Sequence, residues 1–179
     1  PVLPAHGPDR PAAPVGLQSF ELTTLTRLRE LGYRGRTVFL AASRGAPFDL
    51  VSSGDDRDYA DLLSADGLRS LAAAKVDAIG PDKSLVVPVD GDALGTPTGL
   101  VVRAHAAGLR VFVWTLRADN AFLPESLQTG GHPGDLGRAD VEVAAFLRAG
   151  VDGLFCDQPD ICVRARDGLS PSRSGAPTS

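Results

Sequence analysis

Residues 97–115, PTGLVVRAHAAGLRVFVWT, contain the pattern that decides the fold of this chain. A helical stretch starts at Pro97 and ends at Gly108, and a short apolar strand, VFVWT, begins at Val111. Glycine is typical of a helix C-terminus because it adopts the left-handed backbone conformation without steric cost. Thr96 predicts an N-cap, with proline at the first helical position after it. The stretch therefore predicts one helix–glycine–strand unit.

Two more units repeat this order of helix, glycine and apolar strand. They are LTTLTRLRELG at 22–32 with TVFLAA at 37–42, and RADVEVAAFLRAG at 138–150 with VDGLFCD at 151–157. Two strands complete the set, VGLQSF at 15–20 and VDAIGP at 76–81, and a helical stretch over 64–75 precedes the second. Short, continuous apolar strands that alternate with helices indicate a parallel sheet whose faces are both covered. The sequence therefore predicts an α/β fold with five parallel strands.

These units define the limits of one domain, which we predict to span residues 15–166. A helix that starts at Pro159 ends it, and residues 167–179, rich in Ser, Pro and Gly, are predicted to be a disordered tail. Residues 1–14 are predicted to be an irregular lead-in without the apolar core of a signal peptide. The segment at 43–63 is longer than an ordinary connection, so we interpret it as a functional or variable insertion.

Composition and charge narrow the class of protein. The chain has 179 residues, of which 43% are hydrophobic and 22% charged, as expected for one globular domain. Its formal net charge of −4 argues against binding to nucleic acid or anionic membranes, and no apolar run is long enough for a membrane span. Cys156 and Cys162 are too few for a disulfide framework. The sequence favours two free core thiols, and one local bridge is the alternative if the chain is secreted.

Polar side chains gather where the predicted strands end. They are Gln18, Ser19 and Glu21, Ser43 and Arg44, Asp82 and Lys83, Thr115 and Arg117, and Asp157. In parallel α/β proteins this edge of the sheet binds ligands. Trp114, the only tryptophan, stands next to this edge, and a packing role and a role as an apolar ligand wall are about equally supported. The residues alone thus predict a site at this edge but no catalytic pair.

The other polar candidates have simpler explanations. Glu21 complements the dipole of the helix that follows it, and Asp157 and Asp160 are explained as helix caps. Gln18 differs, because it lies inside a predicted buried strand, where an amide needs partners. The histidines are His6, His105 and His132. None of them ends a strand, so a surface or packing role is favoured, and the sequence holds no HExxH, paired CxxC, GxSxG or P-loop motif.

Four segments, taken in order, resemble the second half of the glycerophosphodiester phosphodiesterase family. They are LQSFE at 17–21, DAIGPDK at 77–83, VFVWTLRADNAFLP at 111–124 and GVDGLFCDQPD at 150–160. The resemblance covers roughly residues 15–166 and is closest to the branch that is exported to the periplasm or cell surface. It implies a TIM barrel of the phospholipase C-like phosphodiesterase type, of which this chain has about strands four to eight.

The activity that the resemblance implies is hydrolysis of glycerophosphodiesters to glycerol 3-phosphate and an alcohol. A divalent metal, Ca²⁺ or alternatively Mg²⁺, neutralises the phosphoryl oxygens, and a histidine pair moves the protons. The His-Arg, E-x-D and Glu-x-Lys motifs that supply these groups do not occur in this sequence, and His6 is followed by Gly-Pro instead of Arg-Gly. We therefore expect metal ligands outside these residues, an inactive fragment, and open sheet edges at 15–20 and 151–157.

The resemblance also assigns four residues to the substrate side and no residue to catalysis or metal binding. Gln18, Phe20 and Trp114 are expected to face the mouth of the active site, where Trp114 forms a wall for the glycerol or alcohol end. Arg117 is a candidate for contact with the phosphate or with the rim loop. The implied partner is a small glycerophosphodiester, and the implied location is periplasmic or secreted. Two alternatives remain, a barrel phosphodiesterase of the phospholipase D or sphingomyelinase type and a non-catalytic half-barrel that binds a partner.

Overall fold

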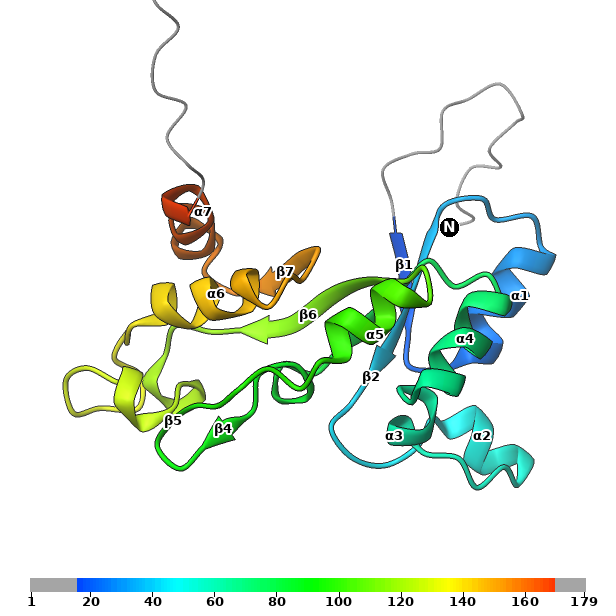
Figure 1. Cartoon of the computed structure of the whole chain (residues 1–179), viewed down its shortest axis with the longest axis horizontal. Helices are drawn as coiled ribbons and strands as arrows, with labels where there is room; N and C mark the ends of the chain where they lie inside the picture. The colour runs from blue at the N-terminus through cyan, green and yellow to red at the C-terminus, as the bar shows by residue number, and fades with distance from the viewer. Residues whose placement is uncertain (1–15, 170–179) are drawn as a thin grey trace, which may run out of the picture.

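The computed structural model describes residues 16–169 of the chain. Five parallel strands form one sheet in the order β1-β2-β3-β6-β7 (Figure 1). These strands are β1 (Gly16–Ser19), β2 (Arg36–Ala41), β3 (Ala78–Pro81), β6 (Arg110–Leu116) and β7 (Gly153–Cys156). The prediction of an α/β fold with five parallel strands is confirmed. The predicted lead-in at 1–14, His6 and residues 170–179 lie outside the described residues.

Helices precede or follow each of these strands. They are α1 (Leu22–Glu30), α4 (Ala65–Ala73), α5 (Leu100–Ala106), α6 (Ala139–Arg148) and α7 (Pro159–Leu169). Gly32, Gly108 and Gly150 follow α1, α5 and α6 with φ angles of 85°, 81° and 89°, so the predicted left-handed helix ends are confirmed. Helix α7 reaches Leu169 and thus extends into the predicted tail. No helix among residues 16–169 has the length and apolar content needed to cross a membrane.

The start of α5 differs from the prediction. The predicted cap at 96–97 is wrong, because the helix begins at Leu100 and Gly99 occupies the N-cap position without a side-chain cap. The Thr98 hydroxyl instead donates to the Leu85 carbonyl oxygen at 2.7 Å. This long-range bond holds the segment against the turn that follows β3, so the chain enters the helix only after Gly99.

The predicted insertion at 43–63 has secondary structure of its own. It contains α2 (Phe48–Ser53) and α3 (Tyr59–Leu62). Helix α3 begins with a reciprocal cap, in which the Asp58 carboxylate accepts the Asp61 N–H at 2.9 Å and the Asp61 carboxylate accepts the Asp58 N–H at 3.0 Å. After β3, the strands β4 (Val89–Asp90) and β5 (Ala93–Leu94) add a small antiparallel hairpin that was not predicted.

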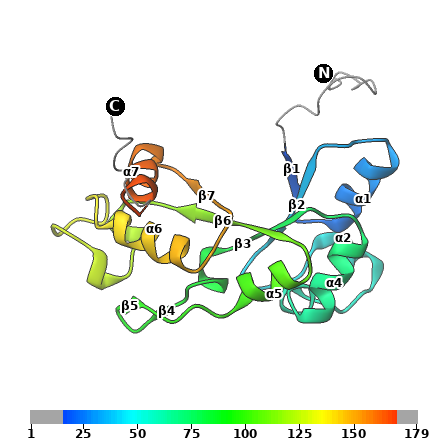
Figure 2. The ribbon, with the colours of Figure 1, turned by 45° about the horizontal axis from the view of Figure 1, so that its top comes forward.

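Alternate strand residues separate two apolar clusters. The larger cluster packs the sheet against the helices and includes Phe39, Ile79 and Val113 of the strands and Leu68, Ala104 and Phe146 of the helices. The smaller cluster lies on the opposite face and consists of Val38, Leu40 and Ala78, with Phe112 and Trp114 packed against it. Within the described residues, β1 and β7 are the open edges of the sheet, as predicted. Figure 2 shows α7 beside α6 at the β7 end.

Two aspartates accept hydrogen bonds from backbone N–H groups of neighbouring strands at the N-terminal edge of the sheet. Asp77 stands just before β3 and accepts the Thr37 N–H at 2.7 Å. Asp152 stands just before β7 and accepts the Val111 N–H at 2.8 Å. Each of these two aspartates follows a valine, at Val76 and at Val151.

Arg29 of α1 binds the first of these aspartates, Asp77, and the groups around it. Its five N–H groups donate to Asp77 Oδ2 at 2.5 Å, Thr37 Oγ1 at 3.0 Å and the carbonyl oxygens of Tyr33, Gly35 and Lys75 at 3.1, 2.7 and 3.2 Å. All donors of the guanidinium are therefore used. The Arg29 side chain is only 20% exposed, so this cluster joins α1, the turn after it and β3 into one unit.

Candidate functional site

A pocket of about 420 Å³ opens where β1, β6 and β7 end. Its lining residues are Gln18, Phe20, Leu40, Trp114, Thr115, Phe155, Cys156 and Asp157. Three of the four residues predicted for the substrate side, Gln18, Phe20 and Trp114, therefore lie together. The fourth, Arg117, is not a lining residue and reaches the pocket through Asp157.

The surroundings of this pocket differ from the prediction in one respect. Gln18 was expected inside a buried strand, but β1 is an edge strand and Gln18 is exposed. Its amide is therefore free to face a ligand. A larger depression of about 540 Å³ lies between α6 and α7 and contains none of the predicted residues. Because ligands of parallel α/β proteins bind at the carboxyl ends of strands, we take the smaller pocket as the candidate site.

Trp114 is held firmly at the pocket wall. Its indole N–H donates to the Gly80 carbonyl oxygen of β3 at 2.6 Å. The ladder between β6 and β7 is irregular between Val113 and Leu116, and such irregularities redirect side chains. Trp114 is half-buried, so it packs against the inner cluster and also lines the pocket. Trp114 therefore has both of the roles that the sequence left open, packing in the protein and lining a pocket for a ligand.

The insertion supplies a residue that sequence reasoning missed. The rings of Phe20 and Trp114 meet edge to face, with centroids 5.7 Å apart and planes at 87°. Phe20 also meets Tyr59 of α3, with centroids 6.4 Å apart. Burial raises the pKa of Tyr59, and the negative charges of Asp49 and Glu21 add to this effect. The insertion therefore packs against Phe20 of the pocket wall through Tyr59. The sequence of the insertion contains no pattern that predicts this contact.

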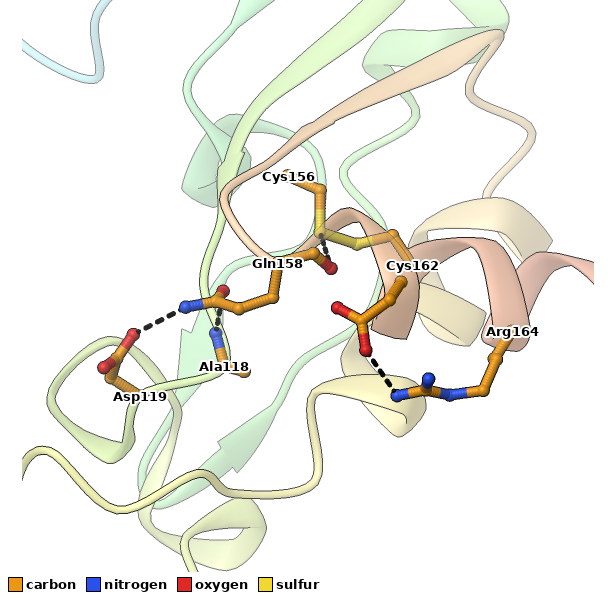
Figure 3. Close-up of a disulfide and its surroundings, with 7 residues drawn as sticks. Ala118, Asp119, Cys156, Gln158, Cys162 and Arg164 are labelled. Carbon is orange, nitrogen blue, oxygen red and sulfur yellow. Dashed lines mark hydrogen bonds and ion pairs between the residues drawn. A yellow bond between two sulfur atoms is a disulfide. The ribbon is translucent and has the colours of Figure 1, made fainter.

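Two loops form the rim of the pocket and are joined by polar contacts. Arg117 Nε donates to Asp157 Oδ2 at 2.6 Å, so Asp157 is paired with Arg117 instead of acting as the predicted helix cap. The Ala118 N–H donates to Gln158 Oε1 at 2.9 Å, and Gln158 Nε2 donates to Asp119 Oδ2 at 3.1 Å (Figure 3). The loop after β6 thus binds the loop after β7 through three consecutive residues, 117–119, which contact Asp157 and Gln158.

The prediction of free thiols is wrong, because Cys156 and Cys162 form a disulfide (Figure 3). The bond joins the end of β7 to the first turns of α7, with Cα atoms 6.6 Å apart. A strand that turns directly into a helix brings residues six apart within reach of each other, which composition does not reveal. The loop that the disulfide closes contains Asp157 and Gln158, so it constrains the residues that carry the rim.

Loss of this disulfide is expected to lower the free energy of unfolding by about 2 kcal/mol, because the closed loop is short and restricts the unfolded chain modestly. Denaturant unfolding with and without a dithiol reductant measures the effect. The variant Cys156→Ser/Cys162→Ser is the control and should not respond to reductant. An unchanged midpoint after complete reduction, verified by thiol counting, would contradict the prediction.

A buried ion pair lies beside the rim and was also missed. Lys83 Nζ donates to Glu142 Oε1 at 2.7 Å and to the Phe122 carbonyl oxygen at 2.7 Å. The Glu142 side chain is 1% exposed, and its Oε2 has no hydrogen-bond partner among residues 16–169. Burial raises the pKa of Glu142, and the charge and hydrogen bond of Lys83 oppose that rise. The centroid of the Phe122 ring lies 4.5 Å from Cζ of Arg117. Because Lys83 binds the Phe122 carbonyl oxygen, it holds the rim loop in place from the interior.

The histidines of the described residues lie away from the pocket lining. His105 Nε2 lies 2.8 Å from Asp152 Oδ2 at the N-terminal edge of the sheet. Burial raises the pKa of Asp152, but the hydrogen bonds from His105 and Val111 and nearby positive charge outweigh this and lower it. His132 accepts the Gly134 N–H within its loop at 3.0 Å. Both positions agree with the surface or packing roles favoured by the sequence.

The described residues do not fit a metal site. No group of three or more His, Cys, Asp or Glu side chains within residues 16–169 is arranged to hold a metal ion. The carboxylates near the pocket are already used, since Asp157 pairs with Arg117 and Asp119 accepts from Gln158. A metal-dependent reaction at this pocket would thus need ligands from elsewhere.

The chain is similar to known phosphodiesterases over most of its length. Residues 8–161 match the profile of the glycerophosphoryl diester phosphodiesterase family. Glycerophosphodiester phosphodiesterase GDPD6 of Arabidopsis thaliana is 32% identical over 145 residues, which make up 80% of this chain and 35% of that protein. The chain therefore spans about a third of the length of this relative.

The architecture also matches a solved structure. A protein of Silicibacter pomeroyi, assigned as a glycerophosphoryl diester phosphodiesterase, superposes with a TM-score of 0.54 at 19% identity. The match covers 86% of this chain and 38% of that chain. It supports the predicted TIM-barrel fold, of which the curled five-stranded sheet forms one part.

Proposed function

Because the chain belongs to the glycerophosphoryl diester phosphodiesterase family, we propose that it forms the substrate-side part of an enzyme that hydrolyses glycerophosphodiesters to glycerol 3-phosphate and an alcohol. The observation that carries this proposal is the pocket at the carboxyl ends of the strands, where Gln18, Phe20 and Trp114 lie together. The name of the Arabidopsis relative is consistent with this reaction.

The residues of this chain would bind and orient the diester. The rings of Phe20 and Trp114 form an apolar wall, and the exposed Gln18 amide can donate to or accept from a ligand oxygen. The Arg117–Asp157 pair would close the rim. A divalent metal, Ca²⁺ or alternatively Mg²⁺, would neutralise the phosphoryl oxygens and would be held by ligands outside these residues. The chain by itself would therefore be inactive.

We also propose a periplasmic or secreted location. The Cys156–Cys162 disulfide supports it, because disulfides persist in oxidising compartments and are rare where thiols are kept reduced.

Hydrolysis of glycerophosphocholine with Ca²⁺ or Mg²⁺, followed as release of glycerol 3-phosphate, tests the reaction. The chain alone should be inactive, and addition of a family segment that carries the His-Arg and E-x-D motifs should produce metal-dependent turnover. In that active pair, Trp114→Leu should lower kcat/KM by about tenfold, because an apolar contact to the substrate is lost. Val102→Ala, an exposed position on α5, is the control. Turnover by the chain alone would refute the assignment of catalytic groups, and no turnover by the pair would favour a non-catalytic binding module.

A further inference from the structure

Gln158 joins the two loops at the rim of the pocket through both ends of its side-chain amide. Its Oε1 accepts the Ala118 N–H at 2.9 Å, and its Nε2 donates to Asp119 Oδ2 at 3.1 Å (Figure 3). A side-chain amide has its acceptor and its donors on separate atoms, so it can satisfy a backbone N–H and a carboxylate at the same time. A carboxylate at position 158 could satisfy only the N–H and would repel Asp119.

The backbone of Gln158 is constrained on both sides. The residue lies inside the loop that the Cys156–Cys162 disulfide closes, and its carbonyl oxygen accepts the N–H groups of Ile161 and Cys162 at 3.1 and 3.4 Å. Pro159, which begins α7, restricts the backbone of the residue before it. The amide therefore projects from a fixed backbone, and less conformational entropy is lost when it binds the other loop.

The ion pair beside this amide cannot set the distance between the loops by itself. Arg117 Nε donates to Asp157 Oδ2 at 2.6 Å, but the two side chains are 39% and 50% exposed. An ion pair with this much solvent contact contributes little, because water screens the charges and both side chains lose freedom. Ala118 is buried and Gln158 and Asp119 are half-buried, where hydrogen bonds are stronger. The amide bridge is therefore the stronger of the two connections.

We propose that Gln158 is a positioning residue for the substrate, which acts by holding Arg117 and Asp157 at the mouth of the pocket. Arg117 is the chain neighbour of Ala118, and Asp157 is the chain neighbour of Gln158. Asp157 lines the pocket, so a shift of its loop changes the shape of the lining. The inference rests on the proposed function, because this pocket is taken as the substrate side of a phosphodiesterase. It goes further because Gln158 was not predicted for the site and does not line the pocket.

Hydrogen exchange of this chain tests the amide bridge without any substrate. The Ala118 amide donates to Gln158, so its exchange rate, measured by NMR, reports the bridge directly. In Gln158→Glu the introduced carboxylate meets that of Asp119, and exchange of the Ala118 amide should become about tenfold faster. The amides of β2 should be affected much less, because only a general loss of stability would accelerate both regions equally. Unchanged exchange at Ala118, or equal acceleration in β2, would overturn the proposal.

A second substitution reverses the direction of the hydrogen bond. In Gln158→Glu/Asp119→Asn the amide at position 119 donates to the carboxylate at position 158, so the charge and shape of the pair are kept. This double variant should return the Ala118 exchange rate to within about twofold of its original value. Gln128→Glu is the matched control, since Gln128 donates to the Leu123 carbonyl oxygen at 3.0 Å and takes no part in the bridge. A double variant that exchanges as fast as Gln158→Glu, or equal acceleration in Gln128→Glu, would contradict the proposal.

Kinetics of the complemented enzyme test the role toward substrate. Gln158→Glu should raise KM for glycerophosphocholine about fivefold and leave kcat within about twofold, because the substrate is held less well and the groups that transfer protons are unchanged. The added Asp119→Asn should restore KM. A smaller folded fraction would lower kcat and leave KM unchanged, so this outcome would refute a positioning role.

The outcomes for the two proposals can be told apart. Hydrolysis with a KM that Gln158→Glu does not change would sustain the phosphodiesterase function and refute the positioning role. Faster Ala118 exchange that Asp119→Asn reverses, without any hydrolysis by the complemented enzyme, would sustain the Gln158 bridge and refute the function.

Discussion

Replacement of Lys83 by methionine is expected to lower the free energy of unfolding by about 3 to 5 kcal/mol, because it leaves the Glu142 carboxylate buried without its partner. Glu142 is 1% exposed, and one of its oxygens already has no partner among the described residues. The Phe122 carbonyl also loses its donor, so the rim loop should loosen. Urea unfolding of the variant and the unchanged chain gives the difference.

The double variant Lys83→Met/Glu142→Met tests the cause. Since well-packed apolar residues commonly replace a buried ion pair without loss of stability, this variant should recover most of the stability that the single substitution removes. If the double variant is as unstable as Lys83→Met, the packing of the lysine chain matters and the unpaired carboxylate does not.

The effect of Lys83→Met should also depend on pH. Burial raises the pKa of Glu142 and Lys83 opposes that rise, so the pKa rises further when the lysine is removed. A carboxyl group whose folded pKa lies above its unfolded pKa contributes stability that is present below the unfolded pKa and lost as pH rises through the folded pKa. The destabilisation should therefore be smaller at about pH 4 than at about pH 7. Lys83→Met/Glu142→Gln should lack this difference, and its persistence there would point to another group.

Replacement of Arg29 by methionine is expected to cost about 3 kcal/mol, because five hydrogen bonds of a largely buried guanidinium are lost at once. The substitution leaves the Tyr33, Gly35 and Lys75 carbonyl oxygens without this donor and removes the charge that faces Asp77. The N-terminal edge of β2 and β3 should open first, since Thr37 and Asp77 belong to the same cluster.

Arg27→Met on the same helix is the matched control. Arg27 also forms an ion pair, with Glu30 at 2.8 Å, but the two side chains are 68% and 63% exposed. Exposed pairs of this kind contribute at most about 0.5 kcal/mol. Equal losses in the two variants, measured by denaturant unfolding, would mean that helix propensity and not the hydrogen-bonded cluster accounts for the effect of Arg29.

The sequence by itself determined the order of the elements, because the signals for them are local. Gly32, Gly108 and Gly150 end helices with positive φ, and the apolar runs after them become β2, β6 and β7. A left-handed residue and a run of apolar side chains have the same consequence wherever they occur in the chain. The resemblance of four short segments to the family also predicted the TIM-barrel fold. It further predicted the edge of the sheet where Gln18, Phe20 and Trp114 lie together.

Only the tertiary structure decided which side chains meet. Lys83 and Glu142 are 59 residues apart, Ala118 and Gln158 are 40 apart, and neither pair has a pattern that links its members. The same holds for the Thr98 bond that moves the start of α5 and for the disulfide that a strand-to-helix turn permits. Such contacts depend on how far each strand is displaced along the sheet and how each loop folds back. The displacement of each strand and the path of each loop are set only when all the elements pack together, because burial of apolar surface between the elements determines both.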